Sequence, residues 1–421
     1  MSTTAAAFVS DAVTLGNRVT LNVGVRFDHT RAFSQDLRAV DLQGHETEEV
    51  VIGVDTLYTW NMWSPRVGAT AKLTADGRTI LRTSYGRFTQ GVLTGELEVF
   101  HRGQSPITTR GFDAATGDYT RIISVLSNKG NLLLDPDTRP PQTDEYSIGV
   151  DRQVGRTFST ALAYIHKQGS DFIGWTETAG RYEEQTRTLP NGNRVPVLAL
   201  TNGGASRRFL LTNPEGYSMT YNGVVLAVER RRSQRWHALG SYTFSKAYGL
   251  LASSGTSAAG AQLRTVSPPQ PLTFGRDPND LTKARGRLPN DRPHIFRALG
   301  NVEIPWVRVM IAANFQHFSG KPWAATAQVE LPQNNQQRVL LERRGSRRLS
   351  SQSLLDLRVS KTVPMGGLAR IELMLDVLNA LNDRAEESIA SDNRFSSNLR
   401  QPTVFVDPRR AMMGVRVHLG R

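Results

Sequence analysis

The chain has 421 residues, no cysteine, and a formal net charge of +13 from 51 basic and 38 acidic residues. The absence of cysteine excludes disulfides, a thiolate nucleophile and cysteine-ligated metals. The basic residues are scattered over turns and loops without a zinc-finger, helix-turn-helix or RNP-type motif, so we expect no nucleic-acid partner and favour an anionic surface such as lipopolysaccharide or phospholipid headgroups.

The first clear element in chain order is Val19–Asp28. Its odd-numbered residues, from Val19 to Phe27, are all apolar, and its even-numbered residues are Thr, Asn, Gly, Arg and Asp. This period of two predicts a β-strand, and about ten residues is the length that crosses a bilayer at the tilt of a barrel strand. Ala7–Leu15 precedes it as a plausible partner, with Gly16-Asn17 as the turn.

The same unit, two strands joined by a short turn, recurs along the chain. The turns include Ala75-Asp76-Gly77, Val154-Gly155-Arg156, Ser233-Gln234, Pro305-Trp306 and Met365-Gly366-Gly367. With a last single strand, the pattern predicts about thirteen strands. The further predicted strands are Pro65–Leu73, Arg78–Thr89, Thr143–Arg152, Thr157–Lys167, Tyr221–Arg231, Trp236–Lys246, His294–Ile304, Val307–Phe318, Leu354–Val363, Ala369–Asn379 and Ala411–Leu419.

The connections between these hairpins are long and rich in Gly, Pro, Asn, Ser and Arg. Loops of this length are uncommon in compact soluble domains. Their alternation with tight turns is typical of an outer-membrane β-barrel, which has short periplasmic turns and long extracellular loops. The predicted connections are Thr30–Met62, Gln90–Gln142, Gly169–Thr220, Ala247–Pro293, Ser319–Ser353 and Asn382–Arg410.

The distribution of charge within the strands supports the same interpretation. In Leu354–Val363, aliphatic residues alternate with Asp356 and Arg358, and Ile371–Asn379 and Ala411–Leu419 follow the same pattern. Charges on one face of successive strands are costly in a sandwich core but suit a water-filled lumen. Aromatic residues near strand ends predict interfacial girdles; they are Trp60, Trp63, Tyr85, Tyr146, Tyr164, Tyr221, Trp236, Tyr242, Trp306 and Trp323.

A transmembrane helix is excluded, because the chain lacks a run of about 18 or more apolar residues. Val307–Phe315 is the nearest candidate, and it is short and interrupted by Arg308. The sequence therefore predicts an all-β protein, an antiparallel transmembrane β-barrel located in the outer membrane. A soluble all-β protein, such as a propeller or a carbohydrate-active enzyme, would show blade-like repeats of similar length.

Several segments, taken in order, resemble the TonB-dependent-receptor superfamily, specifically its Oar-like outer-membrane barrels. They are Pro141–Arg152, the hairpin Tyr221–Arg231 with Ala238–Ala247, Asn290–Phe296, and the hairpin Leu355–Pro364 with Glu372–Asn382. The resemblance implies a larger barrel, of about twenty-two strands, around a plugged lumen. We therefore expect residues 1–421 to be the C-terminal portion of such a barrel domain, without the plug domain, the TonB box or the signal peptide.

Motifs for chemistry are few. The chain has no His-Glu-x-x-His, Gly-x-Ser-x-Gly, phosphate-loop or dinucleotide motif, so we expect neither an enzyme nor a cofactor. His294 and His317 could meet on adjacent strands, but a shared metal is not expected. Asp135-Pro-Asp137 and Asp277–Asp280 lack the spacing of a calcium loop and suit ordinary turns.

Two basic clusters remain, Arg230-Arg231-Arg232 beside a short turn, at the predicted periplasmic rim, and Arg343-Arg344 with Arg347-Arg348 in a long connection. The second could contact lipopolysaccharide phosphates, but for both the favoured interpretation is a solvated, lipid-proximal group of charges.

The expected function is that of a TonB-dependent transporter or receptor barrel, which contributes the wall and the extracellular capture loops. TonB would act through the missing N-terminal plug region, and the substrate would be bulky: a peptide, a glycan or a metal chelate. The alternative is a passive outer-membrane barrel or a surface adhesion protein without TonB coupling. The sequence assigns no substrate-binding residue.

Overall fold

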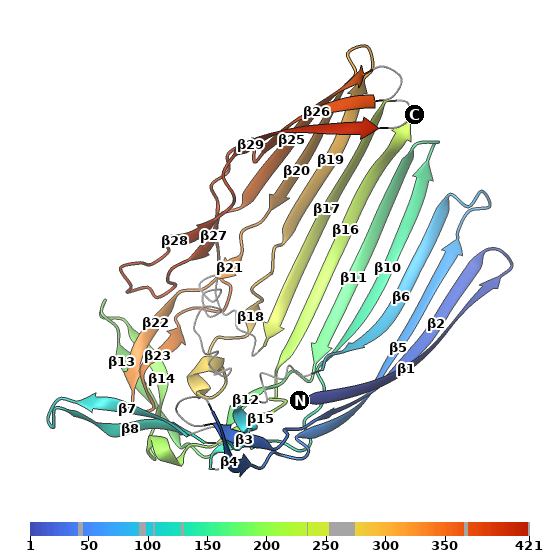
Figure 1. The fold of residues 1–421 in the computed structure, drawn as a ribbon. Helices are drawn as coiled ribbons and strands as arrows, with labels where there is room; N and C mark the ends of the chain where they lie inside the picture. Colours follow the sequence, from blue (N-terminus) through green and yellow to red (C-terminus); the bar gives the residue numbers. More distant parts are fainter. Residues whose placement is uncertain are drawn as a thin grey trace.

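The main feature of the computed structural model is one antiparallel sheet of fourteen strands. The structure describes residues 1–40, 45–91, 98–103, 106–127, 130–233, 235–251, 274–365 and 369–419. Thirteen strands follow one another in chain order, and the remaining one, β18 (Gly286–Arg287), pairs with the end of β17. We call the thirteen strands the wall; they lie side by side as one curved surface (Figure 1).

The wall confirms the predicted set of strands, with shifts of a few residues at their ends. Arg308, for example, adopts a positive φ of 52° in the turn, so β20 begins at Val309 rather than Val307. The wall consists of β1 (Ser2–Leu15), β2 (Val19–Ala32), β5 (Tyr58–Lys72), β6 (Thr79–Thr89), β10 (Gln142–Val154), β11 (Phe158–Ser170), β16 (Ser218–Ser233), β17 (Trp236–Leu250), β19 (His294–Ile304), β20 (Val309–Phe318), β25 (Gln352–Met365), β26 (Ala369–Leu378) and β29 (Arg410–Leu419).

The two ends of the wall differ as the sequence predicts. Short turns join the strands at one end, and the long connections gather at the other end (Figure 1). The turn residue Gln234 and the turn residues Gly366 and Gly367 lie outside the described residues. Among the described residues, no pairing joins β29 to β1, so the wall has two free edges and is part of a barrel rather than a closed one.

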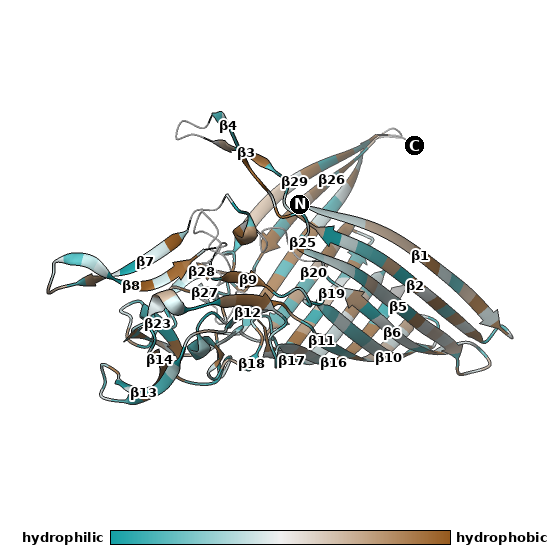
Figure 2. Ribbon diagram, turned by 90° about the horizontal axis from the view of Figure 1, so that it is seen from below, coloured by the Kyte–Doolittle hydropathy of each residue, from teal (hydrophilic) through white to brown (hydrophobic). Residues whose placement is uncertain are grey.

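Along most of the wall, apolar and polar residues lie on opposite faces, because successive side chains of a strand point to opposite sides. In the pairing of β25 with β26, Leu357 stands opposite Val377, and Arg358 stands opposite Asp376. The alternation is visible as bands of brown and teal along the strands (Figure 2). Asp11 is a departure from it, since it shares its register position with Val23 on the apolar face.

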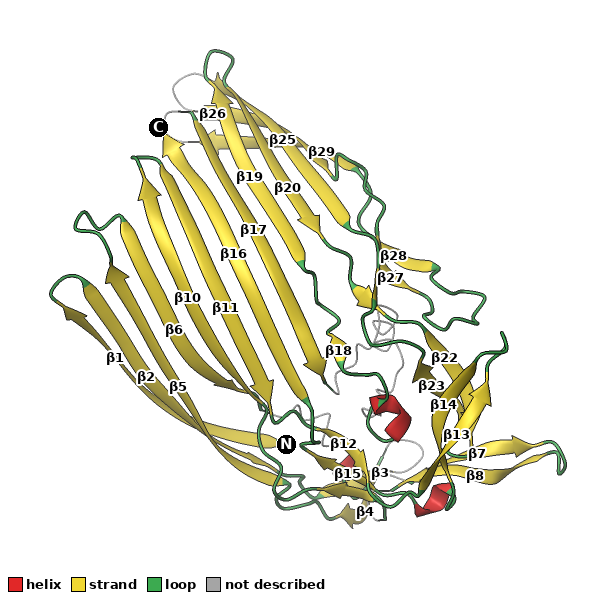
Figure 3. Ribbon diagram, turned by 180° about the vertical axis from the view of Figure 1, so that it is seen from behind, coloured by secondary structure: helices red, strands yellow, loops and turns green. Residues whose placement is uncertain are grey.

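The long connections contain strands and short helices of their own (Figure 3). We call the connections and these elements together the loop layer. It is built from short hairpins and a three-stranded sheet of β12, β15 and β9. Its elements are β3 (Leu37–Val40), β4 (Glu46–Val51), β7 (Ile107–Asp113), β8 (Asp118–Leu126), β9 (Leu132–Leu134), β12 (Gly174–Glu177), β13 (Tyr182–Thr188), β14 (Arg194–Leu200), β15 (Phe209–Thr212), β21 (Pro322–Trp323), β22 (Thr326–Leu331), β23 (Asn334–Leu340), β24 (Arg347–Arg348), β27 (Glu386–Ile389), β28 (Pro402–Phe405) and the 3₁₀ helices η1 (Glu98–Phe100), η2 (Gly204–Ser206) and η4 (Pro278–Leu281).

Within the described part of the chain, no helix is both long enough and apolar enough to cross a membrane.

Buried apolar side chains gather in the loop layer. The first cluster joins Trp175 and Phe209 of the loop layer to Trp60 and Met62 near the start of β5. The indole nitrogen of Trp60 donates a hydrogen bond of 2.7 Å to the carbonyl oxygen of Thr138. The loop layer therefore packs against the polar face of the wall, which becomes the inner face, and leaves the apolar face on the outside.

This core corrects part of the predicted aromatic girdle. Trp60 and Trp323 are 4% and 2% exposed, so both are core residues of the loop layer and not interfacial ones. The prediction failed there because nearness to a strand end does not say which face a side chain takes. Trp63, in contrast, is 60% exposed on the outer face, where its ring centroid lies 4.7 Å from that of Phe27.

Candidate functional site

The inner face of the wall carries charged pairs that join adjacent strands. Arg358 donates two hydrogen bonds to Asp376, of 2.5 and 2.8 Å, in a bidentate arrangement. Further along the wall, Lys167 lies 2.7 Å from Glu145, and Arg82 forms an ion pair with Asp151. These pairs satisfy the charges that strand parity places on one face, and they leave a polar surface on the inside.

A hollow of about 260 Å³ lies on the inner face beside the loop layer. Its floor holds an ion pair in which the Arg26 guanidinium lies 2.7 Å from the carboxylate of Asp28, whose side chain is only 11% exposed. Arg66 lies with its guanidinium carbon 5.0 Å from the ring centroid of Phe88. The hollow can offer both hydrogen bonds and a flat apolar surface to a ligand; its lining is Thr4, Arg26, Asp28, Thr30, Met62, Ser64, Arg66, Phe88, Thr89 and Gly91.

Two carboxylates, the buried Asp291 and the half-buried Glu387, tie the loop layer to the wall. The side chain of Asp291 is fully buried, forms ion pairs with Arg287 at 3.2 Å and with Arg348, and accepts a hydrogen bond of 2.6 Å from the backbone of Ala247. It thus joins the end of β17 to β18 and β24.

Glu387 of β27 likewise connects the loop layer to the wall, through a hydrogen bond from Gln352 of β25. It pairs with Arg292 at 3.4 Å and with Lys321. Burial by itself raises the pKa of Glu387, but hydrogen bonds from Lys321 and Gln352 outweigh that effect and hold the pKa below its usual value. The carboxylate therefore stays ionised, and the ion pairs persist over the neutral range.

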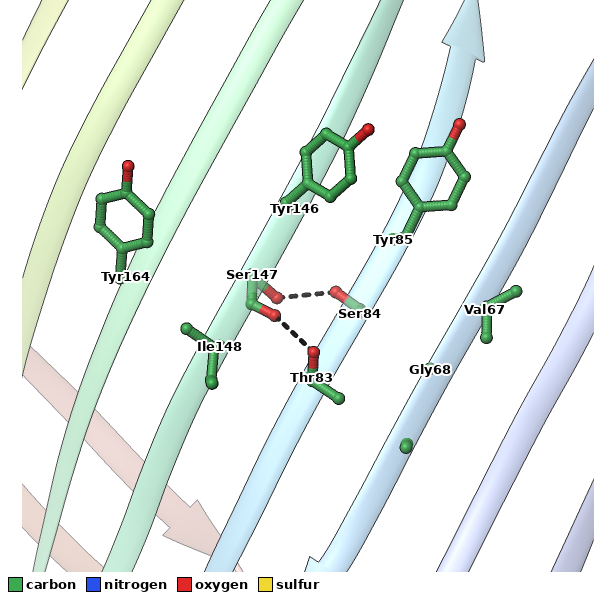
Figure 4. A pocket seen from close by; sticks show the side chains of 10 residues that line it. Val67, Gly68, Thr83, Ser84, Tyr85, Tyr146, Ser147, Ile148 and Tyr164 are labelled. Atoms are coloured by element: carbon green, nitrogen blue, oxygen red, sulfur yellow. Dashed lines mark hydrogen bonds between the residues drawn. The ribbon is translucent and has the colours of Figure 1, made fainter.

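A second hollow, of about 350 Å³, lies on the outer face of β5, β6, β10 and β11 (Figure 4). Three tyrosines, Tyr85, Tyr146 and Tyr164, stand along it beside Ile148 and Val67. The hydroxyl of Tyr85 donates to Asp144 at 2.8 Å, and Arg87, two residues further along β6, pairs with the same carboxylate. An apolar groove with a charged rim suits the boundary between acyl chains and headgroups.

The structure gives separate partners to the histidines considered for a metal. His294 Nδ1 lies 2.7 Å from the hydroxyl of Tyr242, and His317 Nδ1 lies 2.9 Å from the hydroxyl of Ser353. Asp135 accepts a hydrogen bond from the backbone of Asp137, as in an ordinary turn. Among the residues that the structure describes, no group of three or more His, Asp and Glu side chains could hold a metal ion.

The basic cluster Arg343–Arg348 corrects a second prediction in part: Arg343 and Arg347 are exposed, but Arg344 and Arg348 are held within the loop layer and are not solvated. Arg344 is 2% exposed, Arg348 pairs with the buried Asp291, and Arg347 lies 2.6 Å from Glu342. At the other cluster, the Arg230 guanidinium carbon stands 3.4 Å from the ring centroid of Trp236. The side chains of Arg231 and Arg232 lie outside the described residues.

The sequence reasoning missed Asp291 and Glu387 as anchors. Asp291 belongs to the segment Asn290–Phe296, which we noted for its resemblance alone. Its signal was present in the flanking arginines, Arg287 and Arg292, since a carboxylate between arginines is a natural centre for an ion-pair network.

A curved antiparallel wall with an apolar outer face, a charged inner face and long connections over one end is the architecture of an outer-membrane β-barrel. The chain belongs to the outer membrane beta barrel domain family, whose model matches residues 1–321. That family is defined by a membrane barrel and not by an enzymatic domain.

Two kinds of similarity to known proteins accompany the family match. The chain is 23% identical over 365 residues to the TonB-dependent transporter Oar of Myxococcus xanthus. The aligned region covers 76% of this chain and 30% of that protein. Its fold resembles the outer membrane transporter YddB from Escherichia coli (TM-score 0.53, 12% identity, 98% of this chain, 53% of that chain). It also resembles the ferric-catecholate import receptor Fiu of E. coli (TM-score 0.52, 14% identity, 98% of this chain, 44% of that chain).

The copper transporter OprC gives a similar result, with a TM-score of 0.52 at 14% identity, over 99% of this chain and 49% of that one. The chain thus spans about a third of the length of its curated relative and about half of these solved barrels. At these identities the structural likeness shows the fold alone.

Proposed function

We propose that this chain forms part of the wall and the extracellular loop layer of a TonB-dependent outer-membrane transporter. The similarity to the Oar transporter supports this proposal. Because the chain spans 30% of that relative, we take residues 1–421 as the C-terminal portion of a longer receptor. A plug domain in the remaining portion would receive energy from TonB.

The observation that carries the proposal is the packing of the loop layer onto the inner face. Tyr58, Trp60 and Met62 of β5 share one core with Trp175 and Phe209 of the loop layer. A ligand held by the loop layer would therefore lie over the inner face, next to the hollow that contains Arg26 and Asp28. The substrate we propose is bulky, either a peptide, a glycan or a metal chelate.

The outer face has a separate proposed partner. Its tyrosine-lined groove and the Arg87–Asp144 pair would contact lipid and lipopolysaccharide of the outer leaflet.

Uptake measurements test the transport role. Cells that carry the complete gene, cells that lack it and cells that lack TonB are compared for uptake of labelled peptides, oligosaccharides and ferric chelates. We expect at least one substrate whose uptake requires both the barrel and TonB. Uptake that requires the barrel but persists without TonB would favour a passive barrel, and no loss of uptake with a loss of cell attachment would favour an adhesion protein.

A further inference from the structure

Two arginines lie close together in the interior of the loop layer. Arg207 precedes β15 and Arg276 precedes η4, and they are 5% and 6% exposed. An Nη2 of Arg207 donates a hydrogen bond to the carbonyl oxygen of Arg276. Asp277, 6% exposed, is the nearby acid, with its carboxylate 3.9 Å from the Arg207 guanidinium. The three residues together carry a net charge of +1.

Aromatic rings form the walls around both guanidinium groups. The guanidinium carbon of Arg276 lies 4.2 Å from the ring centroid of Trp175 and 5.6 Å from that of Phe209. The guanidinium carbon of Arg207 lies 4.9 Å from the same Phe209 ring. Ring faces support a flat cation, but they do not accept the in-plane N–H groups that a guanidinium directs outward.

Several buried polar atoms of this cluster lack hydrogen-bond partners among the described residues. Among the described residues, all three side-chain nitrogens of Arg276 and the Nε of Arg207 have no hydrogen-bond partner, and neither does one carboxylate oxygen of Asp277. The cluster thus contains four unpaired donor nitrogens and only one unpaired acceptor oxygen. Guanidinium nitrogens can only donate, so the group that would satisfy them must be rich in acceptors.

Charge points to the same kind of group. Burial and the neighbouring Arg207 lower the pKa of Arg276 to about 10, so the side chain stays a cation at neutral pH. A buried cation without a counter-charge destabilises the fold, because the loss of its hydration is not repaid. Asp277 balances one arginine, and within the described residues no acidic side chain forms an ion pair with the second.

We propose that Arg276 and Arg207 bind an oxyanion, namely a carboxylate, sulfate or phosphate group, between the rings of Trp175 and Phe209. The fork of a guanidinium matches two oxygens of such a group, and two guanidinium groups can share one oxyanion. A bound oxyanion joins the segment before η4 to the sheet of β12 and β15, two parts of the loop layer that are far apart in the sequence. The site requires neither a plug domain nor TonB, so it is independent of the proposed transport role.

Binding measurements on the protein extracted in detergent from outer membranes test this site. Radiolabelled sulfate and phosphate are titrated by equilibrium dialysis at constant ionic strength, with acetate and lipid A phosphate as unlabelled competitors. We expect saturable binding of one anion per chain. Competition by acetate identifies a site that is open to carboxylates. Competition by lipid A phosphate identifies a lipid headgroup as a source of the anion.

Three variants separate the site from general effects of salt. Arg276→Gln should weaken binding at least tenfold, and Arg276→Lys should weaken it less, because it keeps the charge and loses the fork. Arg208→Gln, at an exposed neighbour of Arg207, is the matched control and should bind like the unaltered protein.

The unfolding temperature is a second measurement, and it does not require tight binding. The substitution is expected to change it in the opposite direction from the affinity. In oxyanion-free buffer, Arg276→Gln should unfold at the same or a higher temperature than the unaltered protein, because it removes an unpaired buried charge. With saturating sulfate, the unaltered protein should gain more than the variant. Absence of saturable binding by all of these anions, or equal binding by Arg276→Gln, would overturn the proposal.

Discussion

The wall and the loop layer place charge in different ways. In the wall, Arg358 and Asp376 pair across adjacent strands, and the arginine side chain remains 45% exposed on the inner face. In the loop layer, the side chain of Asp291 is fully buried and is satisfied by Arg287, Arg348 and the backbone of Ala247. Charge in the wall follows from strand parity, whereas charge in the loop layer depends on contacts between distant segments.

Apolar side chains show the reverse contrast. Phe244 and Val415 of the wall are 52% and 65% exposed within the protein, because lipid and not protein covers the outer face. Phe209 and Trp175 of the loop layer are 1% and 3% exposed, as in the core of a water-soluble domain. The two regions are therefore built for different solvents, and the following predictions test that difference.

The largest expected effect concerns the free edges of the wall. β1 and β29 each present unpaired backbone groups along one side, and such edges are not tolerated in lipid. We expect residues 1–421, expressed alone, to aggregate or to misfold in detergent, while the complete protein gives a heat-modifiable band on gels. A stable, heat-modifiable monomer from residues 1–421 alone would contradict this prediction.

Removal of a core side chain from the loop layer should separate the two regions. We expect Phe209→Ala to lower the free energy of unfolding of the loop layer by about 3–5 kcal/mol, the range for loss of a buried aromatic side chain. Limited proteolysis should then cut the connections while the wall keeps its heat-modifiability. Phe112→Ala, at a phenylalanine of the loop layer that is 56% exposed, is the control and should have little effect.

Two neighbouring positions of β25 test the faces of the wall. Leu357→Arg places a cation on the outer face and should cost about 2–4 kcal/mol near the bilayer midplane. Arg358→Ala on the inner face should cost clearly less, although it leaves Asp376 without its bidentate partner. Unfolding in detergent or lipid vesicles measures both, and equal losses would show that the faces are wrongly assigned.

The smallest effect is a pH dependence of the loop layer. Burial, and next the charge of Asp277, raise the pKa of Asp280 to about 7. The backbone of Gly275 and the side chain of Gln337 donate hydrogen bonds to the Asp280 carboxyl group. Tyr217 is a further titratable group close to it. The folded state thus holds a proton that the unfolded chain releases near pH 4. Stability should fall as the pH rises from about 4 to about 7 and stay low above pH 7.

Asp280→Asn tests that dependence, because it keeps the size of the side chain and removes the titration. Tryptophan fluorescence follows unfolding of the loop layer at pH 4, 5.5 and 8, and the variant should show a flatter profile with higher stability at pH 8. An unchanged slope between pH 4 and 7 would assign the pH dependence to other groups.

The sequence by itself determined the wall. The strict alternation in Val19–Asp28, and in each later strand, depends on neighbouring residues only, so it predicts both the strand and its two faces. The lengths of the turns and connections then predict which end of the wall carries the loops. All thirteen predicted strands are present for this reason.

Only the tertiary structure decided how the connections are used. Arg348 meets Asp291 across 57 residues of sequence, and the side chain of Gln333 accepts a hydrogen bond from Leu200 across 133 residues. Trp60 and Trp323 become core residues through contacts of the same kind. No local period encodes which of these distant segments meet, so a composition typical of loops concealed a packed layer with buried charges.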